Sequence, residues 1–162
     1  LGHESVYDLS NEERARLRGE KVGFVFQTFN LIPYLTALEN VLVPLLLSGR
    51  DEGGQIEKAT ALLERVGLGD RLDHKPTELS VGQQQRVALA RMLANDPKVI
   101  LADEPTGNLD SKQGADIVSL FRTLPQRFGH SVLLVTHSDS AADAADYVWH
   151  MRDGRLVNCV RH

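Results

Sequence analysis

Residues 99–105 read VILADEP, a short apolar run that ends in two carboxylates and a proline. The run is continuous and rich in branched residues, which favours a strand in the interior of a parallel sheet. Pro105 cannot donate to a strand ladder, so the strand ends at Asp103 and Glu104. An aspartate at such a strand end binds Mg²⁺ in one class of phosphoryl-transfer site, and the next residue is placed to orient a water. An ordinary exit from a strand into a turn explains the same residues without any chemistry.

Two more apolar runs have the same character, and each is followed by a polar side chain. They are VGFVF at residues 22–26, followed by Gln27, and VLLV at residues 132–135, followed shortly by His137. All three runs are predicted to be fully buried strands, because none of them alternates apolar with polar residues. In open parallel α/β sheets, ligands bind beyond the carboxyl ends of the strands. We therefore expect an amide, two carboxylates and an imidazole at one rim, although strands commonly end in polar residues where they meet solvent.

Capping and turn residues between the runs predict helices and one hairpin. The predicted helices are 11–18 with Ser10 and Glu13 as capping box, a helix to about residue 47 with Thr36 and Glu39 as capping box, a helix in IEKATALLERVGL stopping at Gly67, a helix from Ser80, and 111–128 followed by Gly129. The segment YVWHMRDGRLV is predicted to be a hairpin that turns at Asp153 and Gly154.

Strands that alternate with helices indicate an α/β fold with a mostly parallel sheet. Residues 31–95 carry no strand signal, so this segment is expected to form a helical insertion. The sequence thus predicts two parts. Residues 1–30 and 96–162 form the core around the sheet, and residues 31–95 form a helical subdomain.

Composition excludes several classes of protein. The chain has 162 residues, 42% of them apolar, and a net charge of -4, which argues against a nucleic-acid partner because such domains usually carry a basic face. Cys159 is the single cysteine, and the six histidines show no metal-ligand spacing, so no structural zinc is expected. The run VLVPLLL at residues 41–47 is far shorter than the roughly 20 residues that a bilayer requires. Leu1 is not a methionine and no signal-peptide pattern follows, so we expect a piece of something longer.

The stretch LSVGQQQRVALARML, residues 79–93, begins as an anion site and continues as a core helix. Ser80 can cap the helix, and Gly82 allows an anion to approach the unpaired N–H groups of the first turn. Val87, Ala90 and Leu93 share a face at helical spacing and are expected to anchor the helix in the core. Taken alone, the stretch is better explained as a capped core helix than as an anion site.

Together and in this order, these segments resemble the nucleotide-binding domain of ATP-binding cassette (ABC) transporters, over essentially the whole chain. The resemblance implies a P-loop NTPase (RecA-like) fold, here incomplete, with ATP and Mg²⁺ as cofactors. The matches are Gln27 in FVFQ with the Q-loop, LSVGQ at 79–83 with the signature motif, VILADE at 99–104 with the Walker B strand, GNLD at 107–110 with the D-loop, and His137 with the switch histidine.

The resemblance implies a role for each matching residue. Glu104 would polarise the hydrolytic water, Gln27 and His137 would sense the γ-phosphate, and Asp103 with Gln27 would bind Mg²⁺. Two such domains pair head to tail, and each signature helix closes over ATP that the other domain holds. The implied contributors to nucleotide binding and to communication across that dimer are Ser80, Gly82, Gln83 and Asp110.

The segment VGFVFQTFNLIPYLTALENVLVPLLL, with DLSNEERARLR before it, is most similar to the subfamily of lipoprotein-release and macrolide-export systems. Amino-acid importers share parts of this sequence pattern. The likeness implies a transmembrane permease as partner, a contact with it near residues 30–44, and a cytoplasmic location at the inner face of the membrane. A surface loop and helix with only internal packing is the alternative for residues 30–44.

Two features depart from the family pattern. No G-x-x-x-x-G-K-[ST] phosphate-binding loop (Walker A) occurs, so an amino-terminal portion is expected to be missing and residues 1–162 alone are predicted not to hydrolyse ATP. Val81 stands where the usual signature has its first glycine. A positive φ there would strain a β-branched residue, whereas a helical φ accepts it, so weakened binding is expected.

Two other functions are compatible with parts of the sequence. A noncatalytic shortened subunit would donate its signature helix to a complete partner. A DNA-repair or chromosome-organising ATPase would share the signature and Walker B motifs, but residues 28–78 lack the sustained heptads of a long coiled coil. If amino-terminal strands are absent, apolar sheet surface is expected to be exposed and to promote association.

Overall fold

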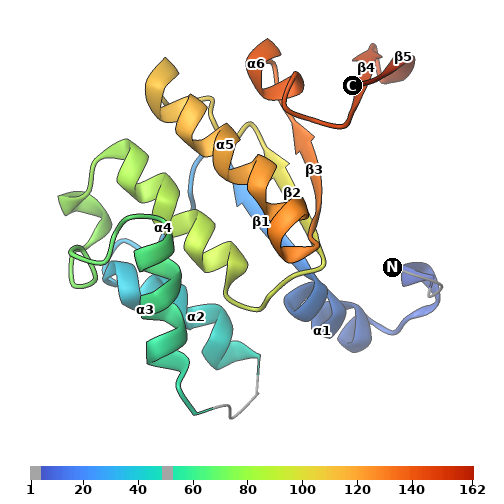
Figure 1. The fold of residues 1–162 in the computed structure, drawn as a ribbon. Helices are drawn as coiled ribbons and strands as arrows, with labels where there is room; N and C mark the ends of the chain where they lie inside the picture. The colour runs from blue at the N-terminus through green and yellow to red at the C-terminus, as the bar shows by residue number, and fades with distance from the viewer. Residues whose placement is uncertain (1–4, 49–52) are drawn as a thin grey trace.

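The centre of the molecule is a three-stranded parallel sheet (Figure 1). The computed structural model describes residues 5–48 and 53–162. The strands are β1 Val22–Phe26, β2 Val99–Asp103 and β3 Ser131–Val135, in the order β1-β2-β3. They pair in register, so Val22, Val99 and Ser131 lie side by side at the start of the sheet. All three predicted strands and their parallel arrangement are confirmed, and their carboxyl ends lie at one rim.

Only one face of the sheet is covered, which corrects the prediction of fully buried strands. Side chains alternate between faces along a strand, and Val25, Ile100 and Ala102 are buried beneath the helices. On the other face, Phe24 is 40% exposed and Leu133 is 49% exposed. A continuous apolar run indicates that a strand is apolar on both of its faces. It does not show that helices among the described residues cover both faces of the sheet.

The described residues form six α-helices, and three of these start directly after a predicted capping residue, Ser10, Thr36 or Ser80. Both predicted capping boxes, Ser10 with Glu13 and Thr36 with Glu39, are present. The first helix extends to Lys21, beyond the predicted end, and the last one was not predicted because it is a single turn. The helices are α1 Asn11–Lys21, α2 Ala37–Leu47, α3 Gln55–Arg65, α4 Val81–Leu93, α5 Ser111–Phe128 and α6 Asp139–Ala142, with 3-10 turns η1 Val6–Asp8 and η2 Pro76–Glu78.

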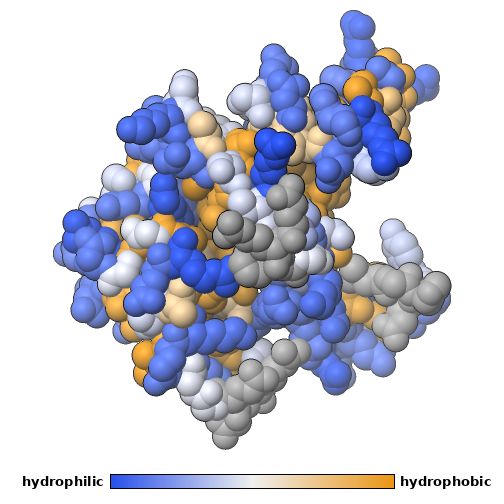
Figure 2. Space-filling model, viewed as in Figure 1, coloured by the Kyte–Doolittle hydropathy of each residue, from blue (hydrophilic) through white to orange (hydrophobic). Residues whose placement is uncertain are grey.

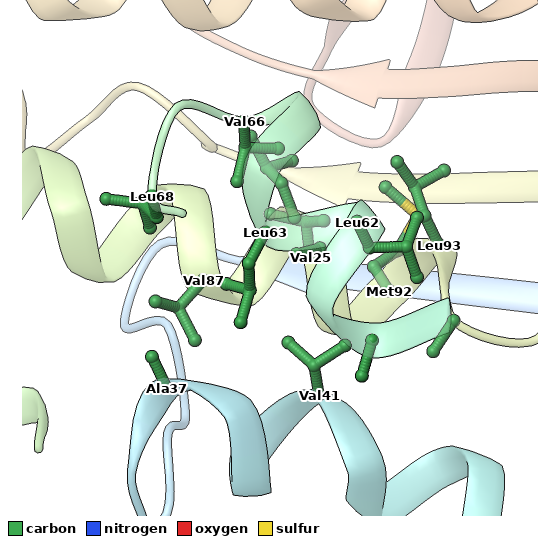
Figure 3. Close-up of a cluster of buried hydrophobic side chains, with 14 of the residues drawn as sticks. Val25, Ala37, Val41, Leu62, Leu63, Val66, Leu68, Val87, Met92 and Leu93 are labelled. Carbon is green, nitrogen blue, oxygen red and sulfur yellow. The ribbon is translucent and has the colours of Figure 1, made fainter. Parts of the chain in front are cut away.

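Helix α4 joins the sheet to the helical layer. Its face of Val87, Ala90 and Leu93 is buried, as predicted. Figure 3 shows Val87 and Met92 among apolar side chains that also come from β1, α2 and α3. A Cβ on Gly23 would lie 2.7 Å from Cγ of Met92, so the absence of a side chain at Gly23 is what lets α4 pack this close to β1. Residues 31–95 contain helices and no strand in their described part, while the division into two domains stays a prediction.

The chain ends in an antiparallel hairpin of β4 Tyr147–Arg152 and β5 Arg155–Arg161, set apart from the three-stranded sheet (Figure 1). Asp153 and Gly154 have φ values of 49° and 73°, as a type I′ turn requires, so the predicted hairpin is confirmed. Its residues are almost all exposed, and Figure 2 shows hydrophobic surface on it between charged groups. No helix of the described residues is both long and apolar enough to span a bilayer.

Candidate functional site

A cavity of about 580 Å³ opens at the carboxyl ends of the three strands. Its wall includes Gln27 after β1, Glu104 after β2 and His137 after β3, together with the start of α5. These side chains are far apart in the sequence and meet because parallel strands all end at the same edge of a sheet. The structure brings together the predicted amide, the imidazole and one of the two predicted carboxylates, that of Glu104.

Glu104 and His137, which follow neighbouring strands, form a polar contact at this cavity. Oε1 of Glu104 lies 3.4 Å from Nε2 of His137, and the Glu104 side chain is 18% exposed whereas that of His137 is 96% exposed. This Glu104 oxygen is buried and accepts no hydrogen bond from the residues that the structure describes. A buried carboxylate oxygen without a donor is costly unless a water or ligand supplies a proton. Glu104 is therefore placed to accept a hydrogen bond from a molecule in the cavity.

The backbone of Glu104 is held in an unusual conformation. Its N–H donates to the carbonyl of Val135 over 2.9 Å, which continues the pairing of β2 with β3 for one residue. Its φ is 46°, in the left-handed region that costs a residue with a Cβ about 1 kcal/mol or more. This turn directs the side chain of Glu104 toward the cavity while the chain leaves the sheet.

Gln27 is held by the loop that follows β2. Its carbonyl accepts a hydrogen bond of 2.9 Å from Nδ2 of Asn108, and its own Nε2 donates to Oδ1 of Asn108 over 3.4 Å. A Cβ on Gly107 would lie 2.8 Å from Nε2 of Gln27, so this glycine leaves room for the amide. The sequence patterns did not single out Asn108, although it belongs to the same GNLD segment as Asp110.

Asp103 does not join Glu104 in the cavity. It pairs in register with Phe26 and Val135, and its exposed side chain shares their uncovered face of the sheet. The carboxylates of Asp103 and Glu104 thus lie on different sides of the rim. Asp110 lines the cavity and caps α5, where its carboxylate accepts a bond of 2.8 Å from the Gln113 N–H.

The start of α4 lies outside the cavity wall. The Ser80 hydroxyl accepts from the Gln83 N–H over 3.3 Å, and Oε1 of Gln83 accepts from the Ser80 N–H over 2.9 Å, which completes a capping box. A Cβ on Gly82 would lie 2.6 Å from Oε1 of Gln113, so α4 begins close against α5. Val81 has a helical backbone without positive φ and is 47% exposed. Its β-branched side chain is accommodated there without strain.

The residues present fit a divalent cation only as part of a larger complex. No group of three His, Cys, Asp or Glu side chains converges within residues 5–48 and 53–162. Mg²⁺ rarely needs such a cage, because it takes one or two protein carboxylates and fills its remaining positions with phosphate oxygens and waters. The carboxylate of Asp103 and the amide oxygen of Gln27 are hard oxygen donors at the rim. They suit Mg²⁺ that arrives with a phosphate compound.

Comparison with known proteins gives a consistent result. A family model described as ABC transporter matches residues 3–107. An uncharacterized ABC transporter ATP-binding protein of Thermotoga maritima is 51% identical over 158 residues, 98% of this chain and 67% of that protein. The macrolide export ATP-binding/permease protein MacB of Syntrophobacter fumaroxidans is 49% identical over 93% of this chain but only 21% of its own length.

The solved structures agree with the sequence relatives. The ATP-binding cassette MJ0796, in a dimeric post-hydrolysis state with ADP and Pi, superposes with a TM-score of 0.84 at 44% identity. The match covers 95% of this chain and 68% of the cassette. The chain therefore spans about two thirds of this cassette and of the Thermotoga maritima protein.

Proposed function

This chain belongs to the ABC transporter family, and from that premise we propose that it is an ATP-binding subunit which powers export or lipoprotein release through a membrane permease. The macrolide export relatives, up to 50% identical, support the direction of transport. Membership of the family implies ATPase activity for the protein to which these residues belong. By the same likeness, the subunit acts at the cytoplasmic face of the membrane, with no nucleic acid as partner.

One observation carries the proposal: Glu104, His137 and Gln27 line a single cavity. Glu104 polarises the attacking water, because its Oε1 accepts no hydrogen bond from the described residues and can accept a proton from that water. The His137 imidazole and the Gln27 amide are placed to sense the γ-phosphate of ATP. Asp103, from the uncovered side of the rim, and the Gln27 amide oxygen, from the cavity side, would hold Mg²⁺, which would supply charge neutralisation for the phosphates.

The residues at the start of α4 belong to a second site in this proposal. Ser80, Gly82 and Gln83 lie outside the cavity wall, and the helix N-terminus favours an anion. They bind the phosphates of ATP held by a second nucleotide-binding domain, paired head to tail. The related cassette MJ0796 is itself dimeric. Asp110, at the cavity edge, communicates between the two sites.

The activity of residues 1–162 on their own follows from the missing phosphate-binding motif. Backbone amides and a lysine of that motif cradle the phosphates, and no Gly-Lys pair occurs in this sequence. We expect purified residues 1–162 at saturating Mg-ATP to release no more phosphate than the Glu104→Gln variant. Turnover that depends on Glu104 would overturn this part of the proposal.

The alternative, a noncatalytic subunit that lends its signature helix, is separated by a mixing experiment. Residues 1–162 are added to the intact Thermotoga maritima relative, and the ATPase rate of the mixture is measured. The alternative is supported if adding residues 1–162 changes the ATPase rate, if the Ser80→Arg variant has no such effect, and if the Ser119→Arg variant still has it. Ser119 is an exposed site on α5 and serves as the control. An unchanged rate, with no complex in sedimentation, removes this alternative.

A further inference from the structure

Arg91, in the last turn of α4, makes two short bonds to a distant loop. Its Nη1 donates to the carbonyl of Asn30 over 2.6 Å and its Nη2 to the carbonyl of Phe29 over 2.7 Å. The loop is the segment that leaves β1 directly after Gln27. Burial lowers the pKa of Arg91, yet a guanidinium titrates so far above neutrality that it keeps its charge. Both bonds are charge-assisted and therefore stronger than neutral ones.

The loop that Arg91 holds is conformationally demanding. Phe29 and Asn30 have φ values of 42° and 49°, both in the left-handed region. Asparagine tolerates this region, whereas an aromatic residue there is a rare outlier. Two successive left-handed residues reverse the chain direction and turn both carbonyls toward α4. The rigid fork of one guanidinium matches two neighbouring carbonyl acceptors, which a single ammonium group cannot reproduce.

The segment from Gln27 to Asn30 is thereby held from two sides. Asn108, in the loop after β2, bonds the backbone and side chain of Gln27, and Arg91 bonds the two residues that end the turn. Arg91 itself is not part of the cavity wall. Its helix carries Ser80 and Gly82 at the opposite end. One rigid helix thus connects the start of α4 with the loop of Gln27.

We propose that Arg91 is a positioning residue, which ties the turn at residues 28–30 to α4 and so sets where Gln27 enters the cavity. A displacement of α4 is then transmitted to the amide of Gln27 through two hydrogen bonds. The link is a property of the fold, while its use in ATP hydrolysis rests on the function proposed above.

The test is an NMR comparison of residues 1–162 without nucleotide, with Arg86 as the matched control. Arg86 lies on the same helix and also bonds a loop carbonyl, that of Val66, over 3.0 Å. In Arg91→Met we expect the backbone signals of residues 27–30 and the side-chain amide signal of Gln27 to shift. Exchange of the Phe29 amide should accelerate about tenfold. Arg86→Met should leave these signals unchanged and shift those around Val66.

A conservative variant keeps the proposal open to refutation if Arg91→Met fails to fold. Arg91→Lys retains the charge and the apolar stem, but it can satisfy only one carbonyl well, so a smaller shift of the Gln27 amide signal is expected. Adding Asn30→Gly to Arg91→Met should move that signal back toward its original position, because glycine adopts positive φ freely. An unmoved Gln27 signal in Arg91→Lys and in any folded Arg91→Met would overturn the proposal. Because no nucleotide is used, the result stands apart from the test of ATP hydrolysis.

Discussion

Oε1 of Glu104 lies 3.4 Å from Nε2 of His137, and the two side chains come from the ends of neighbouring parallel strands. The contact exists because β2 and β3 are paired in register up to Asp103 and Val135, which brings the residues beyond them together. Glu104 reaches it only through its left-handed backbone.

Replacing Glu104 by glycine is expected to give a more stable protein than replacing it by alanine, by about 1 kcal/mol. Both variants remove the carboxylate, but only glycine adopts a φ of 46° without a steric penalty. Urea denaturation at pH 7 measures the difference. At Ser119, exposed in the middle of α5, the order should reverse, because glycine costs about 1 kcal/mol relative to alanine in a helix interior. Equal stabilities of the two Glu104 variants would show that the backbone there is unstrained.

Gly107→Ala is expected to displace the Gln27 amide while changing the free energy of unfolding by less than about 1 kcal/mol. The new methyl group would lie 2.8 Å from Nε2 of Gln27, at the mobile end of an exposed side chain. The Gln27 side-chain amide signal in NMR reports the displacement. Gly114→Ala is the control, because its Cβ meets Thr106 at an ordinary 3.7 Å. That variant should stabilise α5 by about 0.5–1 kcal/mol and leave the Gln27 signal in place.

Asn40→Asp is expected to destabilise the fold more than Asn40→Ala. The side chain of Asn40 is completely buried, accepts from the Ile32 N–H and donates to the carbonyls of Ile32, Leu35 and Thr36. Alanine should cost about 3 kcal/mol through lost and orphaned hydrogen bonds, and aspartate more, because a buried carboxylate would face three carbonyl oxygens. Urea denaturation at pH 7 gives both values. Asn158→Ala, on the exposed hairpin, should cost less than about 0.5 kcal/mol.

Gln85→Glu is expected to make stability fall as pH rises. Gln85 is completely buried and its Nε2 donates to the Pro105 carbonyl over 2.7 Å, while its Oε1 has no hydrogen-bond partner within residues 5–48 and 53–162. A neutral glutamic acid can donate to that carbonyl, but its ionised form would be buried without a donor, which raises the folded-state pKa. Relative to the unaltered chain, stability is therefore full below about pH 4 and is lost as pH rises through the folded-state pKa.

Gln83→Glu supplies a control with the opposite sign. Its carboxylate would accept from the Ser80 N–H at the start of α4, where the helix dipole favours a negative charge and lowers the folded-state pKa. Stability should then be full above the unfolded-state pKa of about 4.3 and should be lost as pH falls through the lowered folded-state pKa. Denaturation curves between about pH 2 and pH 8 decide both cases. Parallel pH profiles for the two variants would contradict the assignment of Gln85 to a donor-free site.

Residues 1–162 are expected to self-associate through the uncovered face of the sheet. Phe24, Phe26, Leu133 and Val135 are between 40% and 57% exposed there, and contiguous apolar surface of this kind promotes association. Leu133→Lys should lower the apparent mass in analytical ultracentrifugation at equal concentration. Val132→Lys, on the covered face, should instead reduce the stability of the fold. A monodisperse monomer of the unaltered chain would tell against this expectation.

Local patterns in the sequence predicted the elements well. Capping boxes, the glycine after α5 and the Asp153-Gly154 turn depend on neighbours three or four residues away, so they can be read from the sequence. Gln27, Glu104 and His137 could be grouped because parallel strands share a carboxyl edge. The order of the motifs along the chain also indicated the family.

The tertiary structure decided what depends on contacts between distant segments. It places Asp103 and Glu104 on different sides of the rim, leaves one face of the sheet uncovered, and pairs Gln27 with Asn108 and the following turn with Arg91. Side-chain periodicity says that a residue faces one side or the other, but the layer it meets is chosen by helices packed from elsewhere in the chain. The sequence by itself thus determined the elements and the chemistry available at their ends. Packing and long-range hydrogen bonds determined which of those groups meet.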